Sequence, residues 1–89
     1  MDVHITKVEM ISVCSYDGKI SPLRFRFEDA DQYLQTVSVT KILDRREMTY
    51  VNVEYFLFIC KGIMQDRERL FELRYAVTSH KWELFRIIY

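Results

Sequence analysis

The sequence predicts an all-β fold, a six-stranded antiparallel meander curled into a small barrel. Apolar and polar residues alternate with a period of two along most of the 89-residue chain, which is the pattern of half-buried strands. Short polar segments rich in turn-forming residues separate six such runs. A meander of this kind has two exposed edges unless it closes, so a small barrel is the expected outcome. At this length, residues 1–89 form a single domain.

The first two strands are expected on either side of an Asp17-Gly18 turn, a strong hairpin signal. The first strand covers residues 8–15 and has apolar residues on both of its faces. In the second strand, Leu23, Phe25 and Phe27 alternate with charged residues. This alternation predicts that the apolar side chains face the core and that the charged side chains face solvent.

The third and fourth strands are expected on either side of a charged turn at residues 44–47. The third covers residues 36–40, where valines alternate with Thr and Ser. The fourth covers residues 50–61 and is apolar at every position from Tyr55 to Cys60, so both of its faces need cover. Such a strand is either buried inside its own fold or contributes a surface that pairs with another chain.

The fifth and sixth strands are expected at residues 71–77 and 81–89, after a polar turn that includes residues 61–69. A short helix near residues 63–74 is the alternative, because apolar residues also recur there with helical spacing. The alternation breaks at Ile42-Leu43 and again at residues 85–88. Bulges are expected at both places, because closure of a sheet requires its strands to bend.

The predicted core takes the alternating apolar residues of all six strands. It consists of Ile11, Val13, Leu23, Phe25, Phe27, Val37, Val39, Val53, Tyr55, Leu57, Ile59, Phe71, Leu73, Tyr75, Trp82 and Leu84.

The overall charge argues against a general nucleic-acid coat protein. The chain has 13 Lys and Arg against 13 Asp and Glu, whereas nonspecific phosphate binding needs an excess of cations. No apolar run approaches the length of a membrane span, and the N-terminal residues lack the pattern of a signal peptide, so a cytoplasmic location is expected. In that compartment Cys14 and Cys60 are expected to be reduced thiols in the core.

The residues that catalysis would need are scarce, so no enzyme activity, cofactor or metal is expected. The two histidines are His4 near the N-terminus and His80 in a predicted turn, where it caps or is solvated by its hairpin. Together with the cysteines they lack the short paired spacings of zinc sites. The acidic residues 28–31 lack the glycine and the closing glutamate of a calcium loop and are expected to form a solvated turn.

Two sets of residues are candidates for binding. Arg24 and Arg26 are expected on the outer face of the second strand, and further cations approach them if the neighbouring turns lie close; the full set is Lys19, Arg24, Arg26, Arg45 and Arg46. Cations beside an aromatic ring such as Tyr16 or Tyr33 are how small barrels bind single-stranded nucleic acid. The second set, on the doubly apolar fourth and sixth strands, predicts self-association through Phe56, Phe58, Phe85 and Ile87.

Several short motifs carry a resemblance to a known group of proteins. They are Asp17-Gly18-Lys19, Pro22-Leu23, Phe27-Glu28-Asp29, the segment VTKILDRR at residues 39–46, and KWELF at residues 81–85. Over residues 10–88 the chain resembles a group of short uncharacterised bacterial proteins with the layout DGxIxPLxFxxED … ILxR … KWxLF. Asp31-Gln32 departs from the glycine turn of that layout. The resemblance implies a bacterial protein and brings no catalytic or binding residues with it.

The sequence therefore predicts a non-enzymatic binding or interaction module of the bacterial cytoplasm, with itself or another protein as partner and without a membrane or metal. The alternative is a small barrel that binds single-stranded nucleic acid.

Overall fold

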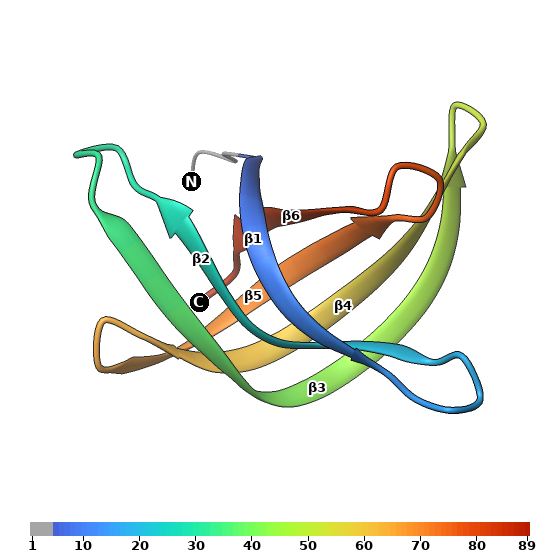
Figure 1. Cartoon of the computed structure of the whole chain (residues 1–89). Coiled ribbons are helices and arrows are strands. Elements are labelled where there is room, and N and C mark those ends of the chain that lie inside the picture. The colour runs from blue at the N-terminus through green and yellow to red at the C-terminus, as the bar shows by residue number, and fades with distance from the viewer. Residues whose placement is uncertain (1–4) are drawn as a thin grey trace.

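The structure, a computed structural model, describes residues 5–89, which form six strands and no helix (Figure 1). The strands are β1 (Thr6–Cys14), β2 (Ile20–Glu28), β3 (Leu34–Tyr50), β4 (Val53–Met64), β5 (Arg67–Ala76) and β6 (Lys81–Ile87). Each strand pairs antiparallel with the next, and β6 pairs with β1, so the sheet closes into a barrel. The predicted all-β six-stranded barrel is confirmed.

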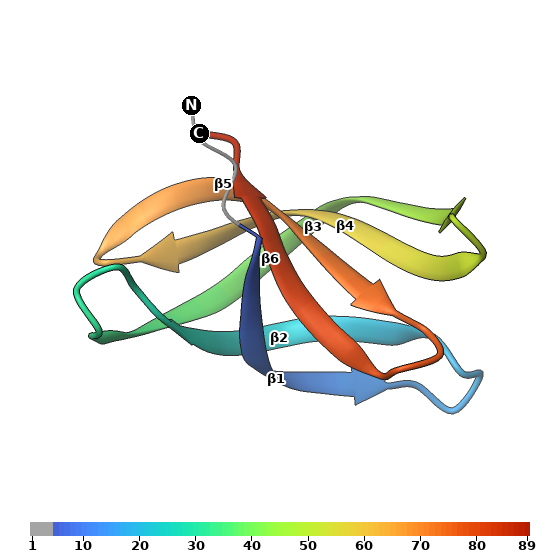
Figure 2. The same ribbon diagram turned by 90° about the horizontal axis from the view of Figure 1, so that it is seen from above.

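The barrel closes through a short seam between β1 and β6. Within residues 5–89, three residue pairs make this seam, Thr6 with Leu84, Lys7 with Glu83 and Val8 with Trp82. Seen from above, β1 and β6 lie side by side at this point and then diverge (Figure 2). Beyond Val8, β1 therefore pairs only with β2 among residues 5–89.

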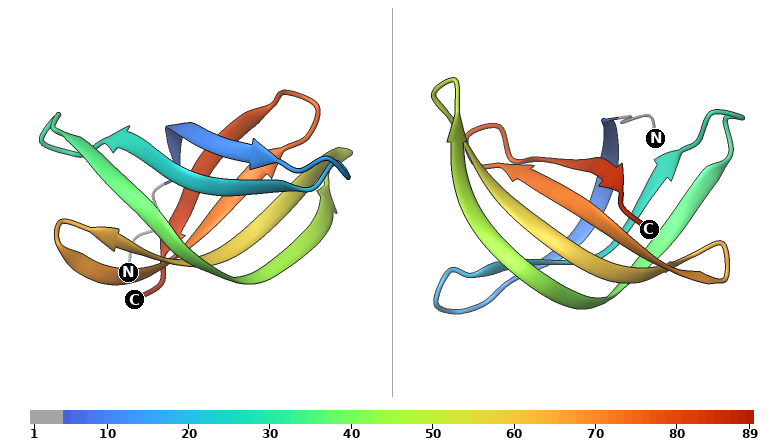
Figure 3. Two further views of the ribbon diagram at one scale, coloured as in Figure 1. Left: turned by 60° about the horizontal axis from the view of Figure 1, so that its bottom comes forward. Right: turned by 180° about the vertical axis from the view of Figure 1, so that it is seen from behind.

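Strand β3 bends sharply and belongs to both halves of the barrel wall (Figure 3). Its first residues pair with β2 as far as Ser38, and from Val37 to Tyr50 it pairs with β4. The register against β4 shifts twice, at Thr40 and at Leu43, so that each of these residues is an extra one in β3. The predicted bulge at Ile42-Leu43 is confirmed, and such extra residues increase the bend and twist of a strand.

The predicted turn at residues 44–47 is wrong, because β3 runs straight through it. The chain reverses instead at Val51 and Asn52, whose φ angles of 49° and 63° give the backbone conformation of a tight two-residue hairpin. Neither residue is Gly, which is why the turn was not evident in the sequence. The charged side chains of residues 44–47 lie along a strand with no partner on one edge, where charge is common.

The boundary between β4 and β5 also differs from the prediction. The polar segment at residues 61–69 is mostly strand, and the reversal is confined to Gln65 and Asp66, again with positive φ. The alternative helix near residues 63–74 is therefore wrong. The predicted break near residue 85 is confirmed on β6. Arg86 pairs with Glu72 and Leu84 pairs with Leu73, so Phe85 is an extra residue without a partner on β5.

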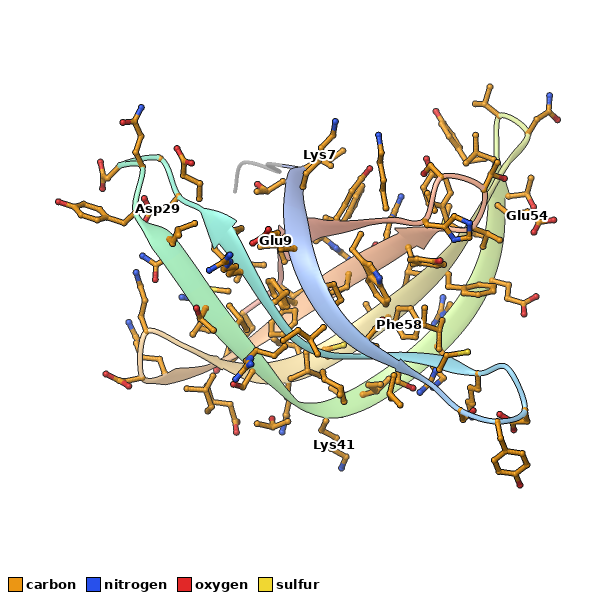
Figure 4. All side chains as sticks on the ribbon, viewed as in Figure 1. Lys7, Glu9, Asp29, Lys41, Glu54 and Phe58 are labelled. Carbon is orange, nitrogen blue, oxygen red and sulfur yellow. The ribbon has the colours of Figure 1, made fainter. Side chains whose placement is uncertain are left out.

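The interior is a cluster of nine buried side chains, and Phe58 lies within it (Figure 4). The cluster consists of Phe25, Val37, Phe58, Cys60, Met64, Phe71, Leu73, Trp82 and Leu84. Six of these were predicted from the period-two pattern. Phe58 and Met64 were not predicted, and Cys60 was expected in the core only as a reduced thiol, because β4 is apolar on both faces and its alternation does not show which face is inside.

Two parts of the predicted core lie on the wrong side of the sheet. On β4, the predicted core residues alternate with the buried Phe58 and Cys60 and so face outward; they are Val53, Tyr55, Leu57 and Ile59. On the β1–β2 hairpin, the exposed residues are Ile11, Val13 and Leu23. The cause in β2 is a register shift in which Leu23 is the extra residue, so that Pro22 and Phe25 are both buried and Leu23 is not.

Gly62 on β4 allows the bent strand β3 to lie close to the core. A Cβ atom at this position would stand 2.5 Å from the Ser38 carbonyl oxygen and 2.9 Å from the ring of Phe71. The Ser38 oxygen belongs to the backbone of the neighbouring strand and cannot rotate away. Any side chain at residue 62 would therefore push β3 and β4 apart where β3 begins to bend.

Substituting Gly62→Ala is expected to lower the free energy of unfolding by about 3 kcal/mol, the upper part of the range for overpacked cores. Urea unfolding followed by Trp82 fluorescence measures it. Gly18→Ala is the matched control, because Gly18 has a φ of 89° but nothing within 4 Å of its added Cβ. It is expected to cost only about 1 kcal/mol through backbone strain. Equal effects of the two substitutions would contradict the close approach at Gly62.

Candidate functional site

A groove opens at the end of the barrel where β2 and β3 separate. Their pairing ends at Arg24 and Ser38, and beyond it the β1–β2 and β3–β4 hairpins diverge, as the right side of Figure 1 shows. The groove between them has a volume of about 260 Å3. We call it the mouth groove; it is lined by Gly18, Lys19, Ile20, Arg45, Arg46, Glu47, Phe56, Leu57 and Phe58.

Arg45 crosses the mouth groove from β3 to β2. Its Nη1 donates a hydrogen bond to the carbonyl oxygen of Ile20 at 2.9 Å, and its Nη2 donates to Ser21 Oγ at 2.5 Å. Its guanidinium carbon also stands 5.3 Å from the ring centroid of Phe58. Arg45 thus occupies backbone and side-chain acceptors on the stretch of β2 that no longer pairs with β3.

Four aromatic rings form a continuous layer on the inner side of the sheet at this end. Ring centroids are 6.1 Å apart for Phe56 and Tyr75, 4.9 Å for Tyr75 and Trp82, and 5.4 Å for Phe58 and Trp82. Phe58 and Trp82 are buried, whereas Phe56 and Tyr75 are half-buried. Glu47 pairs with Phe56 across the β3–β4 ladder and so lies on the same face. The mouth groove therefore combines an apolar floor with charges of both signs.

The five predicted cations do not share one surface. Lys19, Arg45 and Arg46 all border the mouth groove. The side chain of Arg46, however, points to the opposite face of β3 from that of Arg45 and pairs with Asp44 at 2.7 Å. The sequence placed Arg45 and Arg46 together in a turn, and the continuation of β3 separates them.

Arg24 and Arg26 lie on the outer face of β2, as predicted, because Phe25 between them is buried. They border a shallow depression of about 500 Å3, which also includes Glu9. Arg26 makes an ion pair with Glu9, so the cations of this face are partly neutralised. Tyr16 and Tyr33, the aromatic candidates, are exposed in the β1–β2 and β2–β3 connections.

The four residues predicted for self-association are also divided between faces. Phe58 is only 2% exposed, and Ile87 packs against the core, so neither is available for a contact with a second chain. Phe56 lines the mouth groove. Phe85 faces outward, where the guanidinium carbon of Arg74 lies 3.4 Å from its ring centroid.

A buried ion-pair network that the sequence analysis did not find lies on the outside of β5 and β6. Glu72 is 2% exposed and accepts hydrogen bonds from Arg74 Nε at 2.8 Å and from Arg86 Nε at 2.9 Å. Phe85 packs on the guanidinium group of Arg74. The signal in the sequence was weak, because Glu72 looked like an ordinary solvent-facing residue of an alternating strand. Both carboxylate oxygens are occupied, which favours a structural role.

The remaining polar candidates stabilise turns. Asp29 accepts hydrogen bonds from the backbone N–H groups of Asp31 and Tyr33 and from the side chain of Gln35. These bonds, the one from Gln35 foremost, hold the pKa of Asp29 below its ordinary value. His80 has a positive φ in the β5–β6 turn, and its Nδ1 lies 2.8 Å from the hydroxyl of Tyr75.

The described part of the chain shows no group of His, Cys, Asp or Glu arranged to hold a metal ion. His4 lies outside the described residues. Within residues 5–89 there is also no helix that could span a membrane.

The two cysteines are free and have different environments. Cys60 is buried in the core as predicted, and burial raises the pKa of its thiol to about 12. Cys14, which was also expected in the core, is exposed near the end of β1, where the hairpin projects beyond the closed part of the barrel.

Comparison with known proteins brings no further evidence: no protein-family model, curated protein or solved structure matches the chain.

We expect one fast and one slow thiol in the folded protein. At pH 8 Cys14 should react with a disulfide reagent within minutes, whereas Cys60 stays protonated and shielded until the protein unfolds. Absorbance of the released thiolate measures both phases. Cys14→Ser should remove the fast phase alone. Two fast thiols in the native protein would contradict the burial of Cys60.

Replacing Glu72→Gln is expected to lower the free energy of unfolding by about 2 kcal/mol, because Arg74 and Arg86 then lose charge-assisted hydrogen bonds to a buried carboxylate. Glu9→Gln is the matched control, since its ion pair with Arg26 is exposed and should contribute less than about 1 kcal/mol. Urea unfolding of the two variants gives the comparison. Similar losses from both would show that the network at Glu72 is no stronger than a surface pair.

Proposed function

We propose that this protein is a non-enzymatic binding module of the bacterial cytoplasm that holds an extended segment of another protein in the mouth groove. The single observation that carries the proposal is the make-up of this groove. Its floor is apolar and aromatic, and its sides are stretches of β2 and β3 whose facing edges are not paired with each other. Unpaired strand edges beside apolar pockets are the elements by which sheets bind extended peptides.

The charges of the mouth groove favour a polypeptide over a polyanion. Glu47 lies among the groove residues with Lys19 and Arg45, and it would repel a phosphate backbone. A peptide carries side chains of both signs and backbone groups of both hydrogen-bonding types. Arg45 already hydrogen-bonds to the β2 backbone across the gap, so an entering backbone carbonyl would offer it an equivalent acceptor.

One observation supports single-stranded nucleic acid as the second candidate. The rings of Phe56 and Tyr75 are half-buried and lie 6.1 Å apart near Lys19 and Arg45, and aromatic rings beside cations are what single-strand binding barrels use. The ion pairs of Arg26 with Glu9 and of Arg46 with Asp44 reduce the charge available to bind phosphates. We therefore place this candidate second.

The proposal predicts that panning of a random-peptide phage library selects peptides that bind the folded chain with a Kd in the micromolar range. Glu47→Lys should weaken the selected peptides by about tenfold, because it reverses a charge inside the groove. Lys41→Ala is the matched control, since Lys41 points away from the barrel (Figure 4), and it should leave the Kd unchanged. Fluorescence anisotropy of labelled peptides gives the constants.

The same measurement with a labelled oligothymidine separates the two candidates. Under the protein-binding proposal, oligothymidine shows no salt-dependent binding to the native chain. Tight binding that weakens with salt, and weakens again in Lys19→Ala, would establish the nucleic-acid function instead. Peptides whose affinity is the same for the native chain and for Glu47→Lys would remove the mouth groove from the proposal.

A further inference from the structure

The second half of β1 is an open strand edge. Residues 10–14 pair with β2 on one side, and within the described chain they have no strand on the other, because the pairing with β6 ends at Val8. Residues 11–14 are all exposed, including Ile11 at 53% and Val13 at 45%. We call residues 10–14 the β1 edge. Its free N–H and C=O groups are a template for another strand.

The edges of β2 and β3 at the mouth groove carry features that oppose pairing with a second copy of the chain, and the β1 edge does not. Residues 44–47 of β3 are all charged, and residues 20–23 of β2 include Pro22 and are bridged by Arg45. Charges and prolines on edge strands prevent indiscriminate pairing of sheets, whereas a peptide whose charges complement those of the groove can still bind beside them. From residue 10 to residue 16 the sequence MISVCSY contains neither a charge nor a proline.

The sequence of the β1 edge is complementary to itself in an antiparallel arrangement. If two copies pair about Ser12, Ile11 of each copy lies opposite Val13 of the other, and Met10 lies opposite Cys14. The two β-branched residues share the outer face of the strand and form favourable cross-strand pairs. No charged residue faces a like charge within residues 10–14. A two-fold axis through Ser12 gives the closed symmetry that most dimers have.

We propose that two copies of this chain associate through the β1 edge, with residues 10–14 of each pairing antiparallel about Ser12. The pairing joins the β3–β2–β1 sheets of two barrels into one continuous sheet. It buries Ile11 and Val13, which the monomer leaves exposed, and it leaves the mouth groove of each copy outside the contact. The inference is therefore independent of the function proposed for that groove.

Light scattering coupled to size-exclusion chromatography tests the proposal. The native chain is expected to have twice its monomer mass of 10.8 kDa at high concentration. Ile11→Lys/Val13→Lys should weaken the dimer by about tenfold or more, because it places lysine opposite lysine twice. Ile11→Lys/Val13→Glu should restore the dimer, because lysine then faces glutamate. Ile63→Lys is the matched control, since Ile63 is an exposed residue of β4, and it should not change the mass.

Three outcomes would overturn the proposal. A native chain that stays monomeric up to about millimolar concentration has no such dimer. A dimer that survives Ile11→Lys/Val13→Lys uses a different surface. Failure of Ile11→Lys/Val13→Glu to restore the dimer excludes the antiparallel register about Ser12. Glu47→Lys should keep the dimer mass, so loss of peptide binding and loss of the dimer are separate results.

A disulfide provides an independent test of the register. In a Cys14→Ser background, Ser12→Cys places two thiols on the two-fold axis, where Cα atoms of facing residues are about 4.5–5.5 Å apart and within reach of a disulfide. Mild oxidation should then give a covalent dimer on a non-reducing gel. Ser38→Cys in the same background should remain monomeric, because Ser38 lies on β3 away from the β1 edge. Equal cross-linking of the two variants would contradict the register.

Discussion

Strand β3 pairs with β2 over its first residues and with β4 over the rest, and it does both only because it bends. The extra residues Thr40 and Leu43 produce the bend, and Gly62 on β4 provides the space for it beneath Ser38. Phe71 fills the core directly below Gly62, so the packing of the interior and the path of the wall are set at one point. Without this bend, a meander of six strands would be an open sheet with both end strands unpaired.

The bend also determines where the barrel can bind. Because β3 turns away from β2, the wall opens beside Ile20 and leaves a gap that Arg45 crosses without closing. On the far side of the same hairpin, β1 leaves β6 after Val8 and continues with β2 as its only paired strand among the described residues. The β1–β2 hairpin therefore projects with one edge at the mouth groove and the other at solvent. The two surfaces proposed for binding are consequences of the way the barrel closes.

The sequence predicted the fold class, the number of strands and the bulges at Leu43 and Phe85, because these depend on local alternation. The prediction failed where one extra residue interrupts the alternation of inward and outward side chains. On β2 the extra residue is Leu23, so the residues before it face the opposite side from the one that simple alternation predicts. It also failed on β4, where a strand apolar on both faces carries no information about its inner side. The candidate cations were wrongly placed on one surface because the charged segment of residues 44–47 was taken for a turn. It belongs to strand β3, on which neighbouring side chains point to opposite faces.

The seam between β1 and β6 has a consequence for how the chain folds and opens. Every other strand pair joins neighbours in sequence and can form as a local hairpin, whereas β1 and β6 meet only when almost the whole chain has been ordered. Closing the barrel therefore carries the largest loop-closure entropy of any strand pair, at a seam that within residues 5–89 consists of three residue pairs. A barrel opened there would retain its hairpins and would expose Val8, Trp82 and Leu84, which the closed barrel covers.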